Sequence, residues 1–302
     1  MVLILQKVLM FAIDSTKISD FRTHLSASGK QKATVECYSR DMSNFLEFLE
    51  AMAIHSGDVG LSTLEEYKAW LINRNSKPNS IRRAVIAIRM FFRWQEESGK
   101  LHGNPFEEAI VPAHENNALR EIPDEKIDLM LNLARAGETA LKSARDLALL
   151  LLFCREGLKS TEIVALTWTS FFAAGESGRL SIAGDKARTI GLEAQTTVAI
   201  KAYRLVLQED ARTRLYLTPV SQMLVSFKGA DARAVQFGIT RHGLKFAIYE
   251  LGIAAEIPQL NAEQLRHVAM SHKLSIGFTP DMVMNHLGLR RVGNISKHVA
   301  PF

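Results

Sequence analysis

The stretch LNAEQLRHVAMSHKL, residues 260–274, carries a helical pattern with a guanidinium group inside it. Leu265, Val268, Ala269 and Leu274 recur close to the three-and-four spacing that gathers apolar side chains on one side of a helix. A core helix gains nothing from Arg266, so this side chain either faces an acidic partner or holds an external anion. Glu263, three residues earlier, is such a partner at helical spacing, and both alternatives stay open.

The composition is that of a folded basic protein. The chain has 302 residues, of which 47% are hydrophobic, a length that favours two domains over one. Cys37 and Cys154 lie far apart in helix-like runs, which gives no support for a disulfide framework or a zinc site, and we expect neither metal nor cofactor. The formal charge of +5 is compatible with a polyanionic partner without establishing one.

The apolar N-terminus, residues 1–14, is interrupted by Gln6 and Lys7. It lacks the basic start and the cleavage site of a secretory signal, and it is too short to span a bilayer. We therefore expect a cytoplasmic protein without membrane contact, associated with the bacterial nucleoid if it binds DNA.

Patterning divides the chain into two domains. Residues 14–104 show helical periodicity throughout, residues 105–124 hold three prolines and no sustained period, and helical character returns from residue 125 to 302. The alternating stretch RLSIAGDKARTIGL, residues 179–192, predicts a hairpin turning at Gly184. The sequence thus predicts a mostly α fold with a small antiparallel sheet: a helical domain, a linker at 105–124, and an α+β domain.

One helix of the first domain carries a cluster of positive charge. In residues 76–97, Ile81, Val85, Ile88 and Phe92 form the apolar side, whereas the cations are Arg82, Arg83, Arg89 and Arg93. No acidic residue lies between Lys77 and Trp94, although a merely soluble helix tends to mix both signs. Binding of phosphate groups and simple solvation are both compatible with this pattern.

Local signals mark helix ends in the second domain. Gly157 suits the left-handed position after a buried helix, and Ser160 with Glu162 suits the start of the next one. Thr279 and Gly288 are the expected cap and stop of a short helix that begins at Pro280.

The order of these parts resembles the tyrosine recombinase (phage integrase) family. The motifs are a linker beginning with NP, GLKSTEIVALTW at 157–168, GDKAR at 184–188, LRH at 265–267 and HLGL at 286–289, and the likeness covers residues 14–300. The resemblance implies a SAM-like core-binding domain followed by an α+β catalytic-type domain. It also implies a tyrosine nucleophile, two arginines on the scissile phosphate, a hairpin lysine and two His-type residues, with no metal.

Most of these catalytic positions are changed in this chain. The first arginine corresponds to Lys159, the hairpin lysine to Ala183, the histidine before the second arginine to Glu263, and the next His or Trp to Leu289. Arg266 alone is unchanged, with His267 beside it, and Lys186 and Arg188 match downstream basic positions of the hairpin. The position of the tyrosine holds His298, and none of the five tyrosines lies after the HLG motif. We therefore expect no strand cleavage.

The expected function is binding of double-stranded DNA as an accessory or regulatory factor in recombination or in maintenance of a mobile element or chromosome. An active recombinase and self-association are the further expected partners. The expected DNA-binding residues are Arg82, Arg83, Arg89, Arg93, Lys159, Lys186, Arg188, Arg266 and His267, of which His267 also suits a core position. Two alternatives remain: a cryptic recombinase that uses His298 or Ser296 as nucleophile, and a protein-interaction module that has lost DNA binding.

Overall fold

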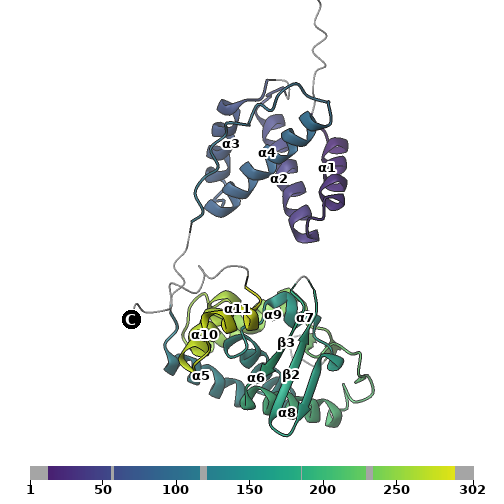
Figure 1. Ribbon diagram of the computed structural model, residues 1–302, viewed down its shortest axis with the longest axis vertical. Helices are drawn as coiled ribbons and strands as arrows, with labels where there is room; N and C mark the ends of the chain where they lie inside the picture. The colour runs from purple at the N-terminus through teal and green to yellow at the C-terminus, as the bar shows by residue number, and fades with distance from the viewer. Residues whose placement is uncertain (1–12, 56–57, 116–120, 185, 229–233, 290–302) are drawn as a thin grey trace, which may run out of the picture. The chain divides into compact units, whose positions relative to one another are not determined.

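The computed structural model describes residues 13–55, 58–115, 121–184, 186–228 and 234–289 (Figure 1). The chain divides into two compact units, residues 1–118 and 119–302. Within the described residues, no helix is both long and apolar enough to cross a membrane. The fold class expected from the sequence is confirmed, since helices dominate and the strands form small antiparallel sheets.

The first unit is built from four described helices: α1 (Ser15–Ala27), α2 (Lys32–Ala51), α3 (Leu61–Asn73) and α4 (Pro78–Glu97). The Asp14 side chain caps α1, and Pro78 begins α4, where its missing N–H costs no hydrogen bond. Helix α2 packs against α1 and α4, and α4 packs against α3. The predicted apolar side of α4 faces this core, with Val85, Ile88 and Phe92 fully buried.

Part of the segment expected to be the linker packs onto the first unit. Phe106 is fully buried, with its ring centroid 4.7 Å from that of Phe92, and Ala109 is also buried. These contacts hold the chain that follows α4 against the same core.

The second unit is organised around α6 (Ala140–Cys154), which packs against α5 (Asp124–Arg135), α8 (Ala194–Glu209) and α10 (Ala262–Ser275). Every residue from Ala148 to Cys154 is buried, as expected of a helix surrounded by other elements. The remaining helical elements are α7 (Ser160–Ala165), the short 3-10 turn η1 (Trp168–Ser170), α9 (Arg241–Ala254) and α11 (Pro280–Leu287).

The described part of this unit also holds two antiparallel sheets. The first has the order β1 (Phe171–Ala174), β2 (Ser177–Ile182) and β3 (Arg188–Leu192), with Leu180 opposite Ile190. The predicted hairpin at 179–192 is therefore confirmed, and β2 alternates exposed and buried residues as a strand with one covered side does. The second sheet pairs β4 (Val225–Lys228) with β5 (Ala234–Phe237), which the sequence analysis did not predict.

Candidate functional site

Three cations of the second unit converge on the C-terminal end of α11. Arg188 Nε donates to the His286 carbonyl at 2.8 Å, and Arg266 Nη2 donates to the Leu287 carbonyl at 3.4 Å. Lys159 Nζ lies 3.5 Å from the Gly288 carbonyl. The last carbonyls of a helix lack partners within the helix and carry partial negative charge, so cations stabilise them. We call Lys159, Arg188 and Arg266 the cation cluster.

Local sequence positions each member of this cluster. Lys159 is the N-cap residue of α7, and its backbone N–H is accepted by the Glu162 side chain at 2.8 Å. Arg188 is the first residue of β3, and Arg266 lies in the second turn of α10. Three separate elements therefore bring these side chains together around α11.

Gly157 allows α11 to pack closely beside the turn whose carbonyl Arg266 contacts. Its φ is +66°, and its carbonyl accepts a hydrogen bond from Arg266 Nε at 2.9 Å. A Cβ at this position would lie 2.8 Å from the side chain of Leu287. Glycine is thus required both by the left-handed backbone and by the packing of α11, as the sequence predicted for the backbone.

Two carboxylates neutralise part of the cluster. Arg188 holds Glu162 with both terminal nitrogens, at 2.8 and 3.2 Å. Burial opposes ionisation of Glu162, but the hydrogen bonds from Arg188 and from the Lys159 backbone outweigh it and lower the pKa of this carboxyl. Arg266 Nη1 lies 3.4 Å from Glu263, so the ion-pair alternative for Arg266 is realised in the structure.

The members of the cluster differ in their access to solvent. The side chains of Arg188 and Arg266 are 11% and 10% exposed, whereas that of Lys159 is 37% exposed. Lys186 is exposed on the hairpin, as is Ala183, and Leu289 packs partly buried beside α11. His267 is half-buried, with Nε2 4.0 Å from Glu263. An anion approaching this region meets Lys159 and Lys186 before it meets the two arginines.

A buried polar network also contacts α11, through the side chain of His286, and it was not predicted from the sequence. Lys273 Nζ contacts Glu156 at 3.1 Å and Glu193 at 2.6 Å, and His286 Nε2 lies 3.2 Å from Glu156. His272 also contacts Glu193, at 3.1 Å. The sequence signal was weak, since Glu156 follows Arg155 at the end of an apolar run and Lys273 follows His272.

The network keeps both acids ionised. Burial works against the charge of Glu156, but the hydrogen bond with His286 and the charge of Lys273 lower its pKa. Burial also raises the pKa of Glu193, but hydrogen bonds with His272 and Lys273 outweigh this effect and lower the pKa to about 2. Because Arg188 holds the His286 backbone while Glu156 holds its side chain, the network and the cation cluster fix the same turn of α11.

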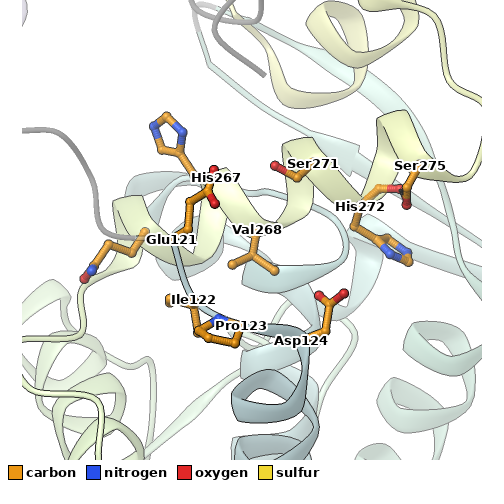
Figure 2. A pocket seen from close by; sticks show the side chains of 10 residues that line it. Glu121, Ile122, Pro123, Asp124, His267, Val268, Ser271, His272 and Ser275 are labelled. Atoms are coloured by element: carbon orange, nitrogen blue, oxygen red, sulfur yellow. Dashed lines mark hydrogen bonds between the residues drawn. The ribbon is translucent and has the colours of Figure 1, made fainter. Parts of the chain in front are cut away.

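A surface cavity of about 550 Å³ runs along α10 beside the chain that enters α5 (Figure 2). Val268 points into it towards Ile122 and Pro123, and Glu121, Asp124 and His272 add polar groups. No member of the cation cluster lines this cavity. Within the described part of the chain, no group of His, Cys, Asp and Glu side chains is arranged to hold a metal ion.

The four arginines of α4 are engaged within the first unit. Arg83 holds the buried carboxylate of Asp41 at 2.7 and 2.9 Å. The other three contact the segment that follows α4: Arg82 donates to the Pro112 carbonyl, Arg89 to the Glu107 and Ala109 carbonyls, and Arg93 to the Glu107 carboxylate. Arg83 and Arg93 thus find acidic partners outside α4, and Arg82 and Arg89 donate to backbone carbonyls.

The tyrosines lie on other elements than α7, β3 and α10, which carry the cation cluster. All five are in described parts of the chain: Tyr38 and Tyr67 in the first unit, Tyr203 on α8, Tyr216 in the loop after α8, and Tyr249 on α9. The expected position of the nucleophile, His298, and its neighbour Ser296 lie outside the described residues.

Comparison with known sequences gives a family model for the first unit and relatives that match most of the chain. Residues 18–98 match the model of the phage integrase N-terminal SAM-like domain. Tyrosine recombinase XerD of Vibrio vulnificus strain YJ016 is 24% identical over 260 residues, which cover 86% of this chain and 82% of the relative. Tyrosine recombinase XerC of Roseiflexus sp. strain RS-1 is 22% identical over 277 residues, 90% of this chain and 85% of the relative.

Solved structures share the fold. XerH site-specific recombinase, bound to a palindromic difH substrate, gives a TM-score of 0.70 at 14% identity, over 95% of this chain and 81% of that one. A lambda integrase dimer bound to a COC' core site gives 0.68 at 12% identity, over 94% and 76%. The domain match and the relatives, which cover most of this chain, support the tyrosine recombinase (phage integrase) family, and the solved structures show the same fold.

Proposed function

We propose that this protein binds double-stranded DNA without cutting it. In this role it acts as an accessory or regulatory factor in DNA recombination or in the maintenance of a mobile element or chromosome. The observation that carries the proposal is the histidine at position 298, where the family resemblance requires a tyrosine, together with the absence of any tyrosine after Tyr249 in the sequence.

The lack of cleavage follows from the chemistry of the positions. Attack on a phosphodiester needs an activated hydroxyl and donors that stabilise the charge developing on the phosphate. Here Lys159 replaces a guanidinium, Ala183 has no proton to give, and Leu289 has no polar group. Loss of a single such donor costs about 3 to 4 kcal/mol of transition-state stabilisation, and these losses occur together with loss of the nucleophile.

DNA binding is supported by the relatives and by charge. The matched XerH and lambda integrase structures hold DNA, and the chain carries a formal charge of +5. On the second unit, exposure favours Lys159 and Lys186 for direct contact with phosphate. Arg188, Arg266 and His267 then stand behind them and shape the site.

On the first unit, the side chain of Arg93 on α4 is 51% exposed and can reach a phosphate from solvent. It can exchange Glu107 for a phosphate at small cost, because an exposed ion pair contributes little stability. Arg82, Arg83 and Arg89 hold the fold around it and contribute to the positive potential at longer range.

The test is capture of fragmented genomic DNA from the source organism on the purified protein at rising salt. Retained DNA is sequenced, and the same sample is run on a denaturing gel. We expect enrichment of a defined site, retention that falls steeply with salt because several phosphates are neutralised, and no protein–DNA adduct on the denaturing gel.

Matched charge variants locate the contact. On the enriched duplex, Lys186→Glu is expected to lower affinity and to reduce the slope of log Kd against log salt by about one to two, whereas Lys201→Glu on α8 leaves both unchanged. A covalent adduct that disappears in Ser296→Ala or His298→Ala would support the cryptic recombinase instead. No enrichment at any salt concentration would overturn DNA binding and favour the protein-interaction alternative.

A further inference from the structure

Helix α9 has two apolar sides, and the fold uses one of them. Leu244, Ala247, Ile248 and Leu251 face the core of the second unit, where α9 packs against α5 and α7. On the opposite side, Phe246, Tyr249 and Ile253 are 56%, 51% and 57% exposed. A surface helix ordinarily carries polar residues there, so this exposed side needs an explanation.

The spacing of the exposed residues is that of a helix–helix seam. His242, Phe246, Tyr249 and Ile253 follow one another at intervals of four, three and four residues, which place them along one line of the helix. This is the spacing at which apolar residues line the contact between two helices that pack at a small angle. The α9 seam, as we call these four residues, therefore has the form of a surface for another helix.

The charges beside the seam indicate which helix. Lys245 lies on one edge and Glu250 on the other, five residues later. In a parallel helix pair, a residue that flanks one edge of the contact faces a residue on the partner helix five positions further along the sequence. Lys245 of each copy therefore meets Glu250 of its partner. In an antiparallel pair, lysine would face lysine and glutamate would face glutamate, which is unfavourable.

We propose that the α9 seam packs in parallel against the same helix of a second copy of this chain, around a two-fold axis. Like residues then stack in layers, Phe246 on Phe246, Tyr249 on Tyr249 and Ile253 on Ile253. Two symmetric Lys245–Glu250 pairs close the edges. Glu250 has an intramolecular partner in Lys142, but at 3.8 Å and with 43% of its own side chain exposed it remains available to a second cation.

The size of the seam sets the strength expected of this contact. The twelve residues from His242 to Ile253 rise about 16 Å along the helix, which is shorter than the contact of a stable dimer of standard size. Self-association through the α9 seam alone is therefore reversible and depends on protein concentration. It does not depend on the proposed DNA binding, and it is measured with no DNA present.

The first experiment is sedimentation equilibrium of the full chain over a wide concentration range. We expect a monomer–dimer equilibrium, with the dissociation constant raised at least about tenfold by Phe246→Glu, because a charge at the centre of the seam must be desolvated. Leu205→Glu on α8, which replaces a side chain of similar exposure (58%), is expected to leave the constant unchanged. Circular dichroism checks that each variant is folded.

Charge exchange distinguishes a parallel pair from other contacts. Lys245→Glu alone and Glu250→Lys alone should each weaken the dimer, and the double variant should restore it, since the two pairs re-form with reversed sign. A Tyr249→Cys variant in a Cys37→Ser background should form a disulfide-linked dimer on mild oxidation, whereas Leu205→Cys should not. A monomer at every concentration, or a dimer unaffected by Phe246→Glu and not restored by the double variant, would overturn the proposal.

Discussion

The ammonium group of Lys273 lies 3.1 Å from the carboxylate of Glu156, and these side chains are only 1% and 0% exposed. The pair joins α10 to the turn that follows α6, two elements distant in sequence. That turn also contains Gly157, whose carbonyl accepts the hydrogen bond from Arg266. The pair therefore supports the position of the cation cluster without belonging to it.

Replacing Lys273 with methionine tests this support. Lys273→Met keeps the length of the side chain but leaves Glu156 buried without its cation, and we expect the free energy of unfolding to fall by about 3 to 5 kcal/mol. Urea denaturation at pH 7 measures the change. The double variant Lys273→Met/Glu156→Gln should recover part of the loss, because the buried charge of Glu156 is removed together with its cation, while Glu193 still lacks Lys273. A loss below about 1 kcal/mol for the single variant would contradict this account.

Acid stability depends on Glu193. Its pKa is lowered in the folded protein to about 2 from an ordinary value of 4.5, so its contribution to stability is present above pH 4.5 and is lost as the pH falls towards 2. For Glu193→Gln we expect a deficit in the free energy of unfolding that is full at pH 6 and shrinks below pH 4.5. Urea titrations at pH 6, 4 and 3 measure it. A deficit that is the same at all three values would count against the ionised carboxylate as its source.

The loss of stability on replacing an arginine of α4 should depend on how deeply its acidic partner is buried. Arg83→Ala leaves the Asp41 carboxylate, whose side chain is 5% exposed, without a partner, and we expect a loss of about 3 kcal/mol in the free energy of unfolding. Arg93→Ala removes an exposed pair with Glu107 and should cost less than about 1 kcal/mol. Thermal and urea denaturation compare the two variants directly. Equal losses would mean that the Asp41 pair is not the structural contact inferred here.

Two glycines allow backbone strain to be separated from packing. Gly157 and Gly277 both have positive φ, +66° and +96°, but an added Cβ would lie 2.8 Å from Leu287 at Gly157 and meets nothing within 4 Å at Gly277. Gly277→Ala should therefore cost about 1 kcal/mol from strain alone, and Gly157→Ala clearly more. Denaturation of both variants gives the difference. If Gly157→Ala costs no more than Gly277→Ala, α11 does not pack as closely as the structure indicates.

The ends of helices in this chain could be predicted from the sequence because the residues that mark them lie within a few positions of each end. Thr279 caps α11, Pro280 begins it and Gly288 ends it with φ +63°, as the sequence predicted. The hairpin of β2 and β3 and the apolar side of α4 were also predictable, since side-chain periodicity reports directly which side of an element is buried. The β4–β5 sheet was missed because its short strands carry too few residues for a period to show.

The sequence by itself determined the mostly helical fold and the excess of positive charge, and it gave the expectation that the catalytic positions are changed, because composition, spacing and residue identity are properties of the chain. Only the tertiary structure decided what each cation touches. Arg83 meets Asp41 across 42 residues of sequence, and Arg188 meets the His286 carbonyl across 98. Ion pairs and hydrogen bonds form between groups within about 3 Å in space, and the distance along the chain gives no measure of that separation.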